Sequence, residues 1–223
     1  ASWDEVYKII KSKIENTDKD KVCGFVGDLT NMETSFIFKE FFDRTINSNN
    51  YESRSTQSFI DTSVRENYLF NTKINGIEQS DLILLIGTNP RFEATMVNAR
   101  IRKSYLNNNV KIISLNEVGD LTYPYKALDG QTQTIKDITE NKNEVSKNII
   151  DSKNPMVIFG DSFLNSKSAS LLFYSMKNFL LKNNKFTDDW NPLNILSSDA
   201  ATVGNFDLDI INFKDDLIKD LYE

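Results

Sequence analysis

The sequence predicts an α/β fold, with a mostly parallel sheet and helices on both faces of that sheet. Short apolar segments recur along the chain, and each is closed by a glycine or a polar turn. Segments with the 3.6-residue apolar spacing of helices lie between them. Strands that are apolar on both faces and alternate with helices are typical of a parallel sheet covered on both sides. The connections between these strands should be right-handed.

The first quarter of the chain is expected to hold two helices and one strand. The residues SWDE at 2–5 have the form of a capping box, which predicts a helix that begins there. Its apolar face comprises Trp3, Val6, Ile10 and Ile14. A strand is expected over residues 22–26. A helix over residues 32–46 is expected to turn four apolar side chains to the core, namely Phe36, Ile37, Phe41 and Phe42. Residues 47–63 are polar and are expected to form a loop.

The middle of the chain contains the clearest strand. Residues 64–79 are expected to form a short helix or turns, and they lead into five consecutive large apolar residues at 82–86. Such a run leaves no face for water, so we expect a central strand there. A Gly-Thr-Asn-Pro turn, a helix over 93–106 and a strand over 110–115 should follow. An irregular loop over 119–130 is expected to be anchored by Tyr123, Pro124 and Tyr125.

The remaining segments are expected to complete a Rossmann-like α/β domain over residues 1–183. Helical patterns cover 131–139 and 143–151, and a strand is expected over 156–159. A long helix over 167–181 should bury a face made of Leu171, Leu172, Met176, Phe179 and Leu180. Residues 184–223 are expected to form an irregular C-terminal extension, with a turn at 190–192 and a terminal helix over 213–222.

Composition excludes several classes of function. The chain has 223 residues, a net charge of -6 and a pI near 4.9, so it lacks the basic excess that nucleic-acid binders use. No apolar run approaches the roughly 20 residues that a membrane-spanning helix needs. The absence of histidine and the single Cys23 exclude a disulfide, a zinc site, an iron–sulfur cluster and Ser-His-Asp chemistry in their usual forms. We therefore assign no catalytic, cofactor-binding or metal-binding residue.

The turn after residues 82–86 is where the predicted fold would place a site. Ligands of open α/β sheets bind just beyond the carboxyl ends of strands, and a helix N-terminus attracts anions. Gly27 and Gly87 could each begin a phosphate-binding loop, but neither continues as G-x-G-x-x-G or as G-x-x-x-x-G-K-[ST]. We therefore interpret both glycines as residues that permit tight strand-to-helix turns.

Four basic residues, Arg91, Arg100, Arg102 and Lys103, form the densest positive cluster. An anion site would require them to converge on one point, yet Arg100 and Lys103 share a helix face that Arg102 does not. Helix stabilisation or an inter-subunit contact is therefore the favoured interpretation. For Arg91, which lies in the turn itself, an assembly contact and an intradomain ion pair both remain open.

The other reactive side chains have simpler explanations. The adjacent carboxylates at 188–189 and at 215–216 point in different directions, so we interpret them as solvated loop charges. Cys23 lies in an apolar segment and is expected to be a small buried hydrophobe. None of these residues is assigned a role in chemistry.

Sequence blocks spread over residues 1 to about 208 match a known pattern. They are SWDE at 2–5, RENYLFNT at 65–72, GIE at 76–78 with Asp81, GTNPRFEATMVNARIRKSYL at 87–106, GDLTY at 119–123, PMV at 155–157, DWN at 189–191 and NIL at 194–196. Together they resemble the large iron–sulfur subunit of respiratory complex I, whose C-terminal part is a molybdopterin-oxidoreductase-like domain. The chain resembles about the first half of that domain.

Two departures separate the chain from enzymes that bind molybdopterin. The turn continues as RFEA at 91–94, where those enzymes run through small and acidic residues to a histidine. Leu115 is followed by NEV at 116–118, where they have an Asp-Pro-type turn. Both departures resemble complex I, and the resemblance implies that the fold is kept without the cofactor. Iron–sulfur clusters are expected in the family's cysteine-rich N-terminal domains, on a split subunit or elsewhere in a longer one.

The resemblance implies a non-catalytic scaffold in the peripheral arm of complex I, the NADH:ubiquinone oxidoreductase. The chain would support electron transfer from NADH to ubiquinone, coupled to proton pumping, without binding a cofactor. The expected partners are other peripheral-arm subunits, including the chain with the iron–sulfur domains, with no nucleic acid and no direct membrane insertion. The expected location is the matrix side of the mitochondrial inner membrane, or the cytoplasmic face of a bacterial inner membrane.

Two alternatives from other classes stay open. The first is a fragment of an active molybdopterin oxidoreductase, which would need room for a pterin dinucleotide beside residues 89–94. The second is a stand-alone nucleotide-binding module that uses the crevice beyond residues 82–86. The loop over residues 89–94 discriminates the first alternative from a scaffold, and a thermal-shift screen with NADH, FAD and GTP discriminates the second.

Overall fold

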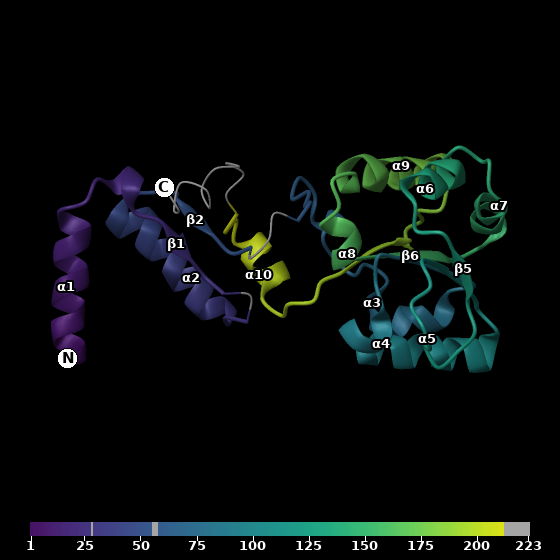
Figure 1. Ribbon diagram of the computed structural model, residues 1–223, viewed down its shortest axis with the longest axis horizontal. Coiled ribbons are helices and arrows are strands. Elements are labelled where there is room, and N and C mark those ends of the chain that lie inside the picture. Colours follow the sequence, from purple (N-terminus) through teal and green to yellow (C-terminus); the bar gives the residue numbers. More distant parts are fainter. Residues whose placement is uncertain (28, 55–57, 212–223) are drawn as a thin grey trace. The chain divides into compact units, whose positions relative to one another are not determined.

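The computed structural model describes residues 1–27, 29–54 and 58–211 (Figure 1). Contacts between Cα atoms divide the chain into two units, one made of Ala1–Ser55 with Asp199–Glu223 and the other of Thr56–Ser198. The predicted domain boundary at residues 183–184 falls inside the second unit, because a strand beyond it belongs to that unit's sheet. The terminal helix predicted over 213–222 lies outside the described residues.

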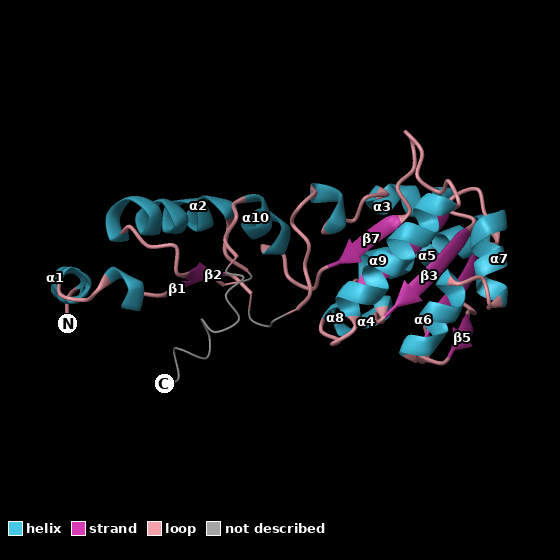
Figure 2. Cartoon of the chain, turned by 90° about the horizontal axis from the view of Figure 1, so that it is seen from above, coloured by secondary structure: helices cyan, strands magenta, loops and turns pink. Residues whose placement is uncertain are grey.

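A five-stranded sheet organises the larger unit (Figure 2). Its order is β5-β4-β3-β6-β7, with β3 (Leu82–Ile86) at the centre. The other strands are β4 (Lys111–Leu115), β5 (Lys126–Leu128), β6 (Pro155–Gly160) and β7 (Leu193–Leu196). All pairings among these five strands are parallel, and β3 pairs over its whole length with both neighbours. The predicted α/β class with a mostly parallel sheet is confirmed.

Helices cover both faces of this sheet. Figure 1 shows α3 (Lys73–Gly76), α4 (Pro90–Glu93) and α5 (Thr95–Asn108) on one side. The other side carries α6 (Thr132–Thr139), α7 (Glu144–Asp151), α8 (Asp161–Leu164) and α9 (Ala169–Lys182). Two short 3-10 helices, η3 (Arg65–Asn67) and η4 (Ile77–Gln79), precede β3.

The side-chain alternation of β3 divides its residues between two cores. Leu82, Leu84 and Ile86 belong to the cluster that contains residues of α6, α7 and α9, whereas Ile83 and Leu85 belong to the cluster that contains residues of α5. All five are at most 2% exposed. A strand has a side-chain period of two, so a strand buried on both faces reads as a continuous apolar run. The prediction of a central strand at 82–86 is confirmed.

Several element predictions for the larger unit need correction. The helix predicted over 93–106 is broken at Ala94 (φ −150, ψ 72) into α4 and α5. β5 and β7 lie in segments predicted to be irregular. Edge strands of three and four residues are too short to show a clear periodicity in the sequence. In α9, Leu171 is 60% exposed, and Phe173 takes the fully buried position instead.

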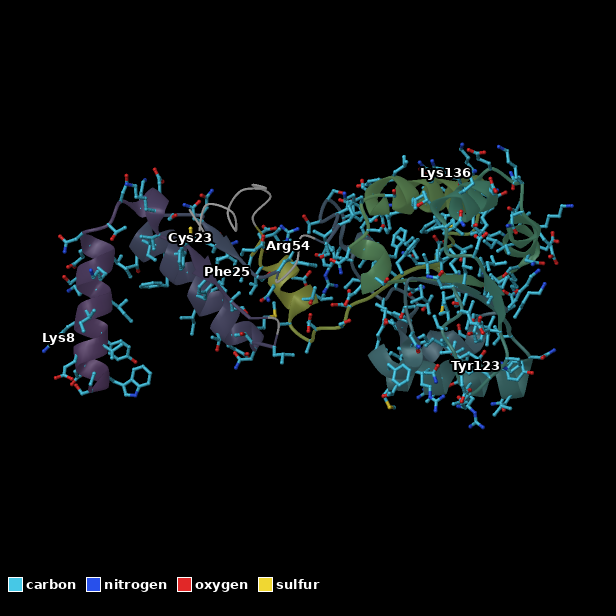
Figure 3. All side chains as sticks on the ribbon, in the orientation of Figure 1. Lys8, Cys23, Phe25, Arg54, Tyr123 and Lys136 are labelled. Carbon is cyan, nitrogen blue, oxygen red and sulfur yellow. The ribbon has the colours of Figure 1, made fainter. Side chains whose placement is uncertain are left out.

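The predicted anchoring of the loop over residues 119–130 is confirmed for Tyr123. Its side chain is buried beside α5, where Figure 3 labels it, and its hydroxyl donates a hydrogen bond of 2.7 Å to Asn98 Oδ1. Burial raises the pKa of this hydroxyl well above its ordinary range. By contrast, Pro124 is exposed and Tyr125 is half-buried.

The smaller unit contains a two-stranded parallel sheet of β1 and β2. Its elements are α1 (Trp3–Glu15), η1 (Lys19–Lys21), β1 (Gly24–Phe25), α2 (Met32–Phe41), the π-helix η2 (Phe42–Ile46), β2 (Tyr51–Glu52) and α10 (Thr202–Asp207). The predicted capping box is confirmed, since Ser2 N donates to Glu5 Oε2 at 2.7 Å and Glu5 N donates to Ser2 Oγ at 3.3 Å.

Four predictions for the smaller unit need correction. The strand expected over 22–26 has only two residues, and β2 lies within the segment expected to be a loop. The helix predicted over 32–46 buries a different face from the one expected, because Phe36, Ile37 and Phe41 are exposed and only Phe42 of the four is buried. Cys23, labelled in Figure 3, is partly exposed rather than buried.

No described helix has both the length and the apolar character that a membrane crossing requires.

Changing Leu84 to Ala should lower the free energy of unfolding by about 2–5 kcal/mol, because the fully buried side chain leaves a cavity. Leu106→Ala on α5 is the matched control: this leucine is 64% exposed, so its loss should stay within about 0.5 kcal/mol. Urea denaturation of both variants measures the difference. Equally small losses would contradict the central position of β3.

Candidate functional site: the switch-point crevice

The sheet changes its direction of growth at β3. β4 and β5 lie on one side of this strand, whereas β6 and β7 lie on the other. Open α/β folds place ligands at this switch point, outside the carboxyl ends of the two adjacent strands. Here those ends lead into residues 87–89 after β3 and residues 161–163 after β6. We call the space between these two turns the switch-point crevice.

Direct packing closes the switch-point crevice. Gly87 has a φ of +63, and a Cβ atom on it would lie 2.4 Å from Phe163 N and 2.5 Å from Phe163 Cβ. A Cβ atom on Gly160 would lie 2.4 Å from Thr88 Cβ and 2.6 Å from Gly87 O. Phe163 is itself buried, with its ring centroid 4.8 Å from that of Phe159. The two glycines therefore allow the turns after β3 and β6 to pack directly against each other. Gly87 also has the positive φ expected of a residue that permits a tight turn.

The polar donors before α4 are used within the chain. Glu93 Oε2 accepts a hydrogen bond from Thr88 Oγ1 at 2.5 Å, and Glu93 Oε1 accepts one from Asn89 N at 3.0 Å. Asn89 Oδ1 in turn accepts from Arg91 N at 3.2 Å. A bound phosphate would accept such bonds at the start of a helix. The Glu93 carboxylate takes that place, and a nucleotide phosphate would have to displace a like charge.

The loop over residues 116–125 is fastened to the same turn. Asn89 Nδ2 donates to Val118 O at 2.8 Å. Arg91 Nη1 donates to Asp120 O at 2.6 Å and to Asp120 Oδ2 at 2.7 Å. Tyr125 also stabilises this loop: its hydroxyl accepts a hydrogen bond from Val118 N and donates one to Gly119 O, each at 3.0 Å. The place beside residues 89–94 where a pterin dinucleotide would need room is therefore bridged by the chain's own loop.

The space that remains near the crevice is small. A cavity of about 120 Å³ lies beside Gly87, and its polar lining comes from Asn116, Thr132, Ser162 and Ser166. Sites for drug-sized ligands have volumes of about 300–1,000 Å³. Asn116, the first residue of the NEV departure, has a φ of 111 and stands over Gly130, where even a Cβ atom would collide with its amide. The cavity is too small for a dinucleotide.

The predicted basic cluster does not converge. Arg91 pairs with Asp120, Lys103 Nζ lies 2.8 Å from Glu78 Oε2, and Arg100 pairs with the same Glu78. Arg102 Nε donates to Thr122 O at 3.2 Å. Hydrogen bonds from Lys103 and Arg100 hold the pKa of Glu78 below its ordinary value. Of the two alternatives for Arg91, the structure contains the intradomain ion pair, with Asp120 as the partner.

The other candidates stay apart from the crevice. Asp188 and Asp189 are exposed, which agrees with their interpretation as solvated loop charges. Residues 215–216 lie outside the described part of the chain. Over the described ranges, no group of three or more His, Cys, Asp or Glu residues is arranged to hold a metal ion. Sequence reasoning missed Glu93 and Phe163. An acidic residue four positions after the N-cap Asn89 signals the first, but no pattern in the sequence signals the second.

Gly87→Ala should destabilise the chain more than Gly119→Ala. Both glycines have a positive φ, which costs an alanine about 1 kcal/mol. Gly119 has nothing within 4 Å of a new Cβ atom, whereas Gly87 faces the backbone of Phe163. We expect an additional loss of about 1–3 kcal/mol at Gly87 from overpacking, measured by urea denaturation. Equal losses would show that the crevice has room.

The coupling between Arg91 and Asp120 should depend on pH. A hydrogen bond from Thr122 N and the Arg91 guanidinium hold the pKa of Asp120 below its ordinary value of 3.8. A lowered pKa gives stability that is present above the ordinary value and is lost as the pH falls through the folded-state pKa. A double-mutant cycle with Arg91→Ala and Asp120→Asn should therefore show coupling at pH 7 and lose it in strong acid. Coupling that persists in acid would argue against this pair.

The relatives that this chain resembles carry similar names, as three of them illustrate. An NADH-quinone oxidoreductase subunit of Rickettsia bellii is 33% identical over 208 residues, which are 93% of this chain and 30% of the relative. The NADH-ubiquinone oxidoreductase 75 kDa subunit of Reclinomonas americana is 32% identical, over 94% of this chain and 32% of the relative. NADH dehydrogenase (ubiquinone) iron-sulfur protein 1, mitochondrial, of Solanum tuberosum is 30% identical, over 98% of this chain and 30% of the relative.

These matches confirm the resemblance to the large iron–sulfur subunit of complex I. The chain spans about a third of the length of the curated relatives it matches. In addition, the family model described as molybdopterin oxidoreductase matches residues 1–220. The chain therefore belongs to the molybdopterin oxidoreductase family.

Proposed function

We propose that this chain is a non-catalytic scaffold within the large iron–sulfur subunit of complex I. It supports electron transfer from NADH to ubiquinone, coupled to proton pumping, without carrying an electron itself. The names of the relatives support the assembly, and the filled switch-point crevice supports the scaffold role. The chain's contribution is the α/β unit around the five-stranded sheet, which holds neighbouring cluster-bearing domains at fixed distances.

The observation that carries this proposal is the carboxylate of Glu93, the last residue of α4, which reaches back to the residues that precede the helix. It accepts the Thr88 and Asn89 hydrogen bonds that a cofactor phosphate would otherwise accept. Phe163 occupies the space next to it, behind Gly87. A molybdopterin enzyme would need both positions open, so the geometry favours the scaffold over a fragment of an active oxidoreductase.

The proposed partners are other peripheral-arm subunits, including a chain or domain that bears the iron–sulfur clusters. The single cysteine and the absence of histidine leave this chain without the thiolates that a cluster needs. The proposed location is the matrix side of the mitochondrial inner membrane, and the bacterial alternative is the cytoplasmic face. Two of the relatives carry ubiquinone in their names and one of these is named mitochondrial.

Purification of the tagged chain from its native cells tests the proposal. We expect it to bring down iron–sulfur-bearing polypeptides and NADH-oxidising activity, with iron but no stoichiometric molybdenum. Leu84→Asp places a charge in the central strand and should abolish this recovery by unfolding the domain. Gly119→Ala, which meets nothing within 4 Å, should leave it intact. A chain recovered alone, with about one molybdenum and a releasable pterin, would contradict the proposal.

A further inference from the structure

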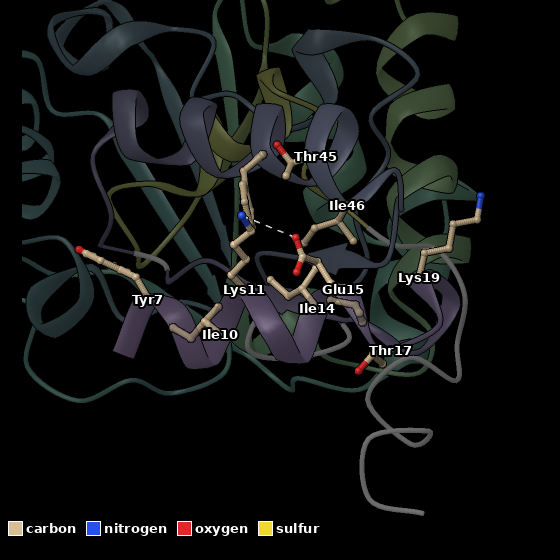
Figure 4. Close-up of a pocket in the computed structure, with 11 residues that line it drawn as sticks. Tyr7, Ile10, Lys11, Ile14, Glu15, Thr17, Lys19, Thr45 and Ile46 are labelled. Carbon is tan, nitrogen blue, oxygen red and sulfur yellow. Dashed lines mark ion pairs between the residues drawn. The ribbon is translucent and has the colours of Figure 1, made fainter. Parts of the chain in front are cut away.

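An apolar groove in the smaller unit has α1 as one of its walls (Figure 4). The groove has a volume of about 530 Å³, and it lies between α1 and the segment that runs from the end of α2 through η2. Its apolar lining consists of Tyr7, Ile10, Ile14, Val22, Phe41 and Ile46. Tyr7 is 60% exposed and Ile10 is 48% exposed, so α1 presents large apolar side chains that the described part of the chain does not cover.

α1 carries these side chains in one continuous stripe. Trp3, Tyr7, Ile10 and Ile14 follow one another at spacings of four, three and four residues, which is the spacing of the a and d positions of paired helices. The rings of Trp3 and Tyr7 stack with their centroids 5.8 Å apart. None of the 13 residues of α1 is buried against the described part of the chain. A helix of this length is marginal in water by itself, so a partner on the stripe would stabilise α1.

The charges beside the stripe make α1 complementary to itself. Asp4 and Lys11 each follow a d position, seven residues apart, so they flank the same side of the stripe. Two copies of α1 can lie antiparallel, with Tyr7 of each copy beside Ile10 of the other. Asp4 of each copy is then opposite Lys11 of the other. A two-fold axis relates the two contacts, as in any interface between identical surfaces.

We propose that two copies of this chain pair through α1, with the two helices antiparallel and their apolar stripes facing each other. A parallel pair would set the two acidic first turns, which contain Asp4 and Glu5, side by side and would align the helix dipoles. The charge distribution therefore favours the antiparallel pair. This pairing is a property of the chain by itself and does not rest on the proposed function.

The apolar area on offer fits a weak but specific pair. Each copy contributes Trp3, which is 73% exposed, and Tyr7. A large aromatic side chain buries about 150–250 Å² when it is fully covered, so these four rings would remove on the order of 500 Å² from water. Ile10 of each copy adds to this area. Specific interfaces bury about 1,200 Å² or more, so the pair lies near their lower end and should have a dissociation constant in the micromolar range.

Analytical ultracentrifugation of the full chain at about 1–100 µM tests the pairing. The chain has a mass of 25.6 kDa, and its sedimentation should approach that of a particle twice as heavy as the concentration rises. Lys11→Asp should raise the dissociation constant about tenfold, because both contacts with Asp4 become repulsive. Lys8→Asp is the matched control. It makes the same change of charge on the same helix, and Figure 3 shows Lys8 pointing away from α2.

A charge swap separates the pairing from the stability of the helix. Asp4→Lys combined with Lys11→Asp restores both contacts with their signs exchanged, so the dissociation constant should return to within about threefold of its original value. The swap places a positive charge in the first turn of α1 and a negative charge nearer its C-terminus, which disfavours the helix by itself. Recovery can therefore come only from contacts between the two copies.

The outcomes decide the proposal as follows. A dimer that Lys11→Asp weakens more than Lys8→Asp does, and that the charge swap restores, supports it. A monomer at every concentration overturns it, and so does a dimer that both single variants weaken equally. A dimer that the swap fails to restore also overturns it, because the copies would then meet in another arrangement. Residues 4, 8 and 11 are all exposed, so the variants should fold, and circular dichroism checks this.

Discussion

The close approach of the turns after β3 and β6 is the constraint on which the larger unit depends. A parallel sheet with β3 at its centre forces these two turns together, because both strands end at the same edge. Gly87 and Gly160 permit the approach, since a Cβ atom on either would collide with backbone of the other turn. Phe163 then fills the space that related folds leave for a ligand. The architecture of a binding fold is kept while its binding site is used for packing.

Electrostatics reinforce the same outcome. The free N–H groups at a helix start attract an anion, and the chain supplies its own in Glu93. Asn89 and Arg91 then fasten the turn to the loop over residues 116–125. These polar groups satisfy one another, so neither a cofactor nor a metal is needed to hold the turn. The smaller unit differs, because large apolar side chains of α1, such as Tyr7 and Ile10, stay exposed in the described part of the chain.

The sequence predicted elements where one local pattern dominates. Five apolar residues at 82–86 specify a doubly buried strand, and the SWDE motif specifies the start of α1. The pattern was insufficient where apolar residues surround a helix: the segment FIFKEFF at 36–42 has apolar side chains on several faces, so tertiary packing chooses the buried one. β7 was missed because Asn194 is fully buried in it and accepts a hydrogen bond of 2.9 Å from Thr72 N, a partner 122 positions away. The location of the candidate site was predictable from the strand and its turn, but Phe163 could not be, since only the fold brings it there.

The protein's own residues already occupy the switch-point crevice. Amide chemical shifts of Gly87, Thr88 and Asn89, followed by NMR during titration with GDP and with NADH, test it most directly. We predict that these three amides stay unchanged up to millimolar ligand, because Glu93 and Phe163 hold the positions that a nucleotide would take. A saturable shift of all three amides would contradict the account and would identify the crevice as a working nucleotide site.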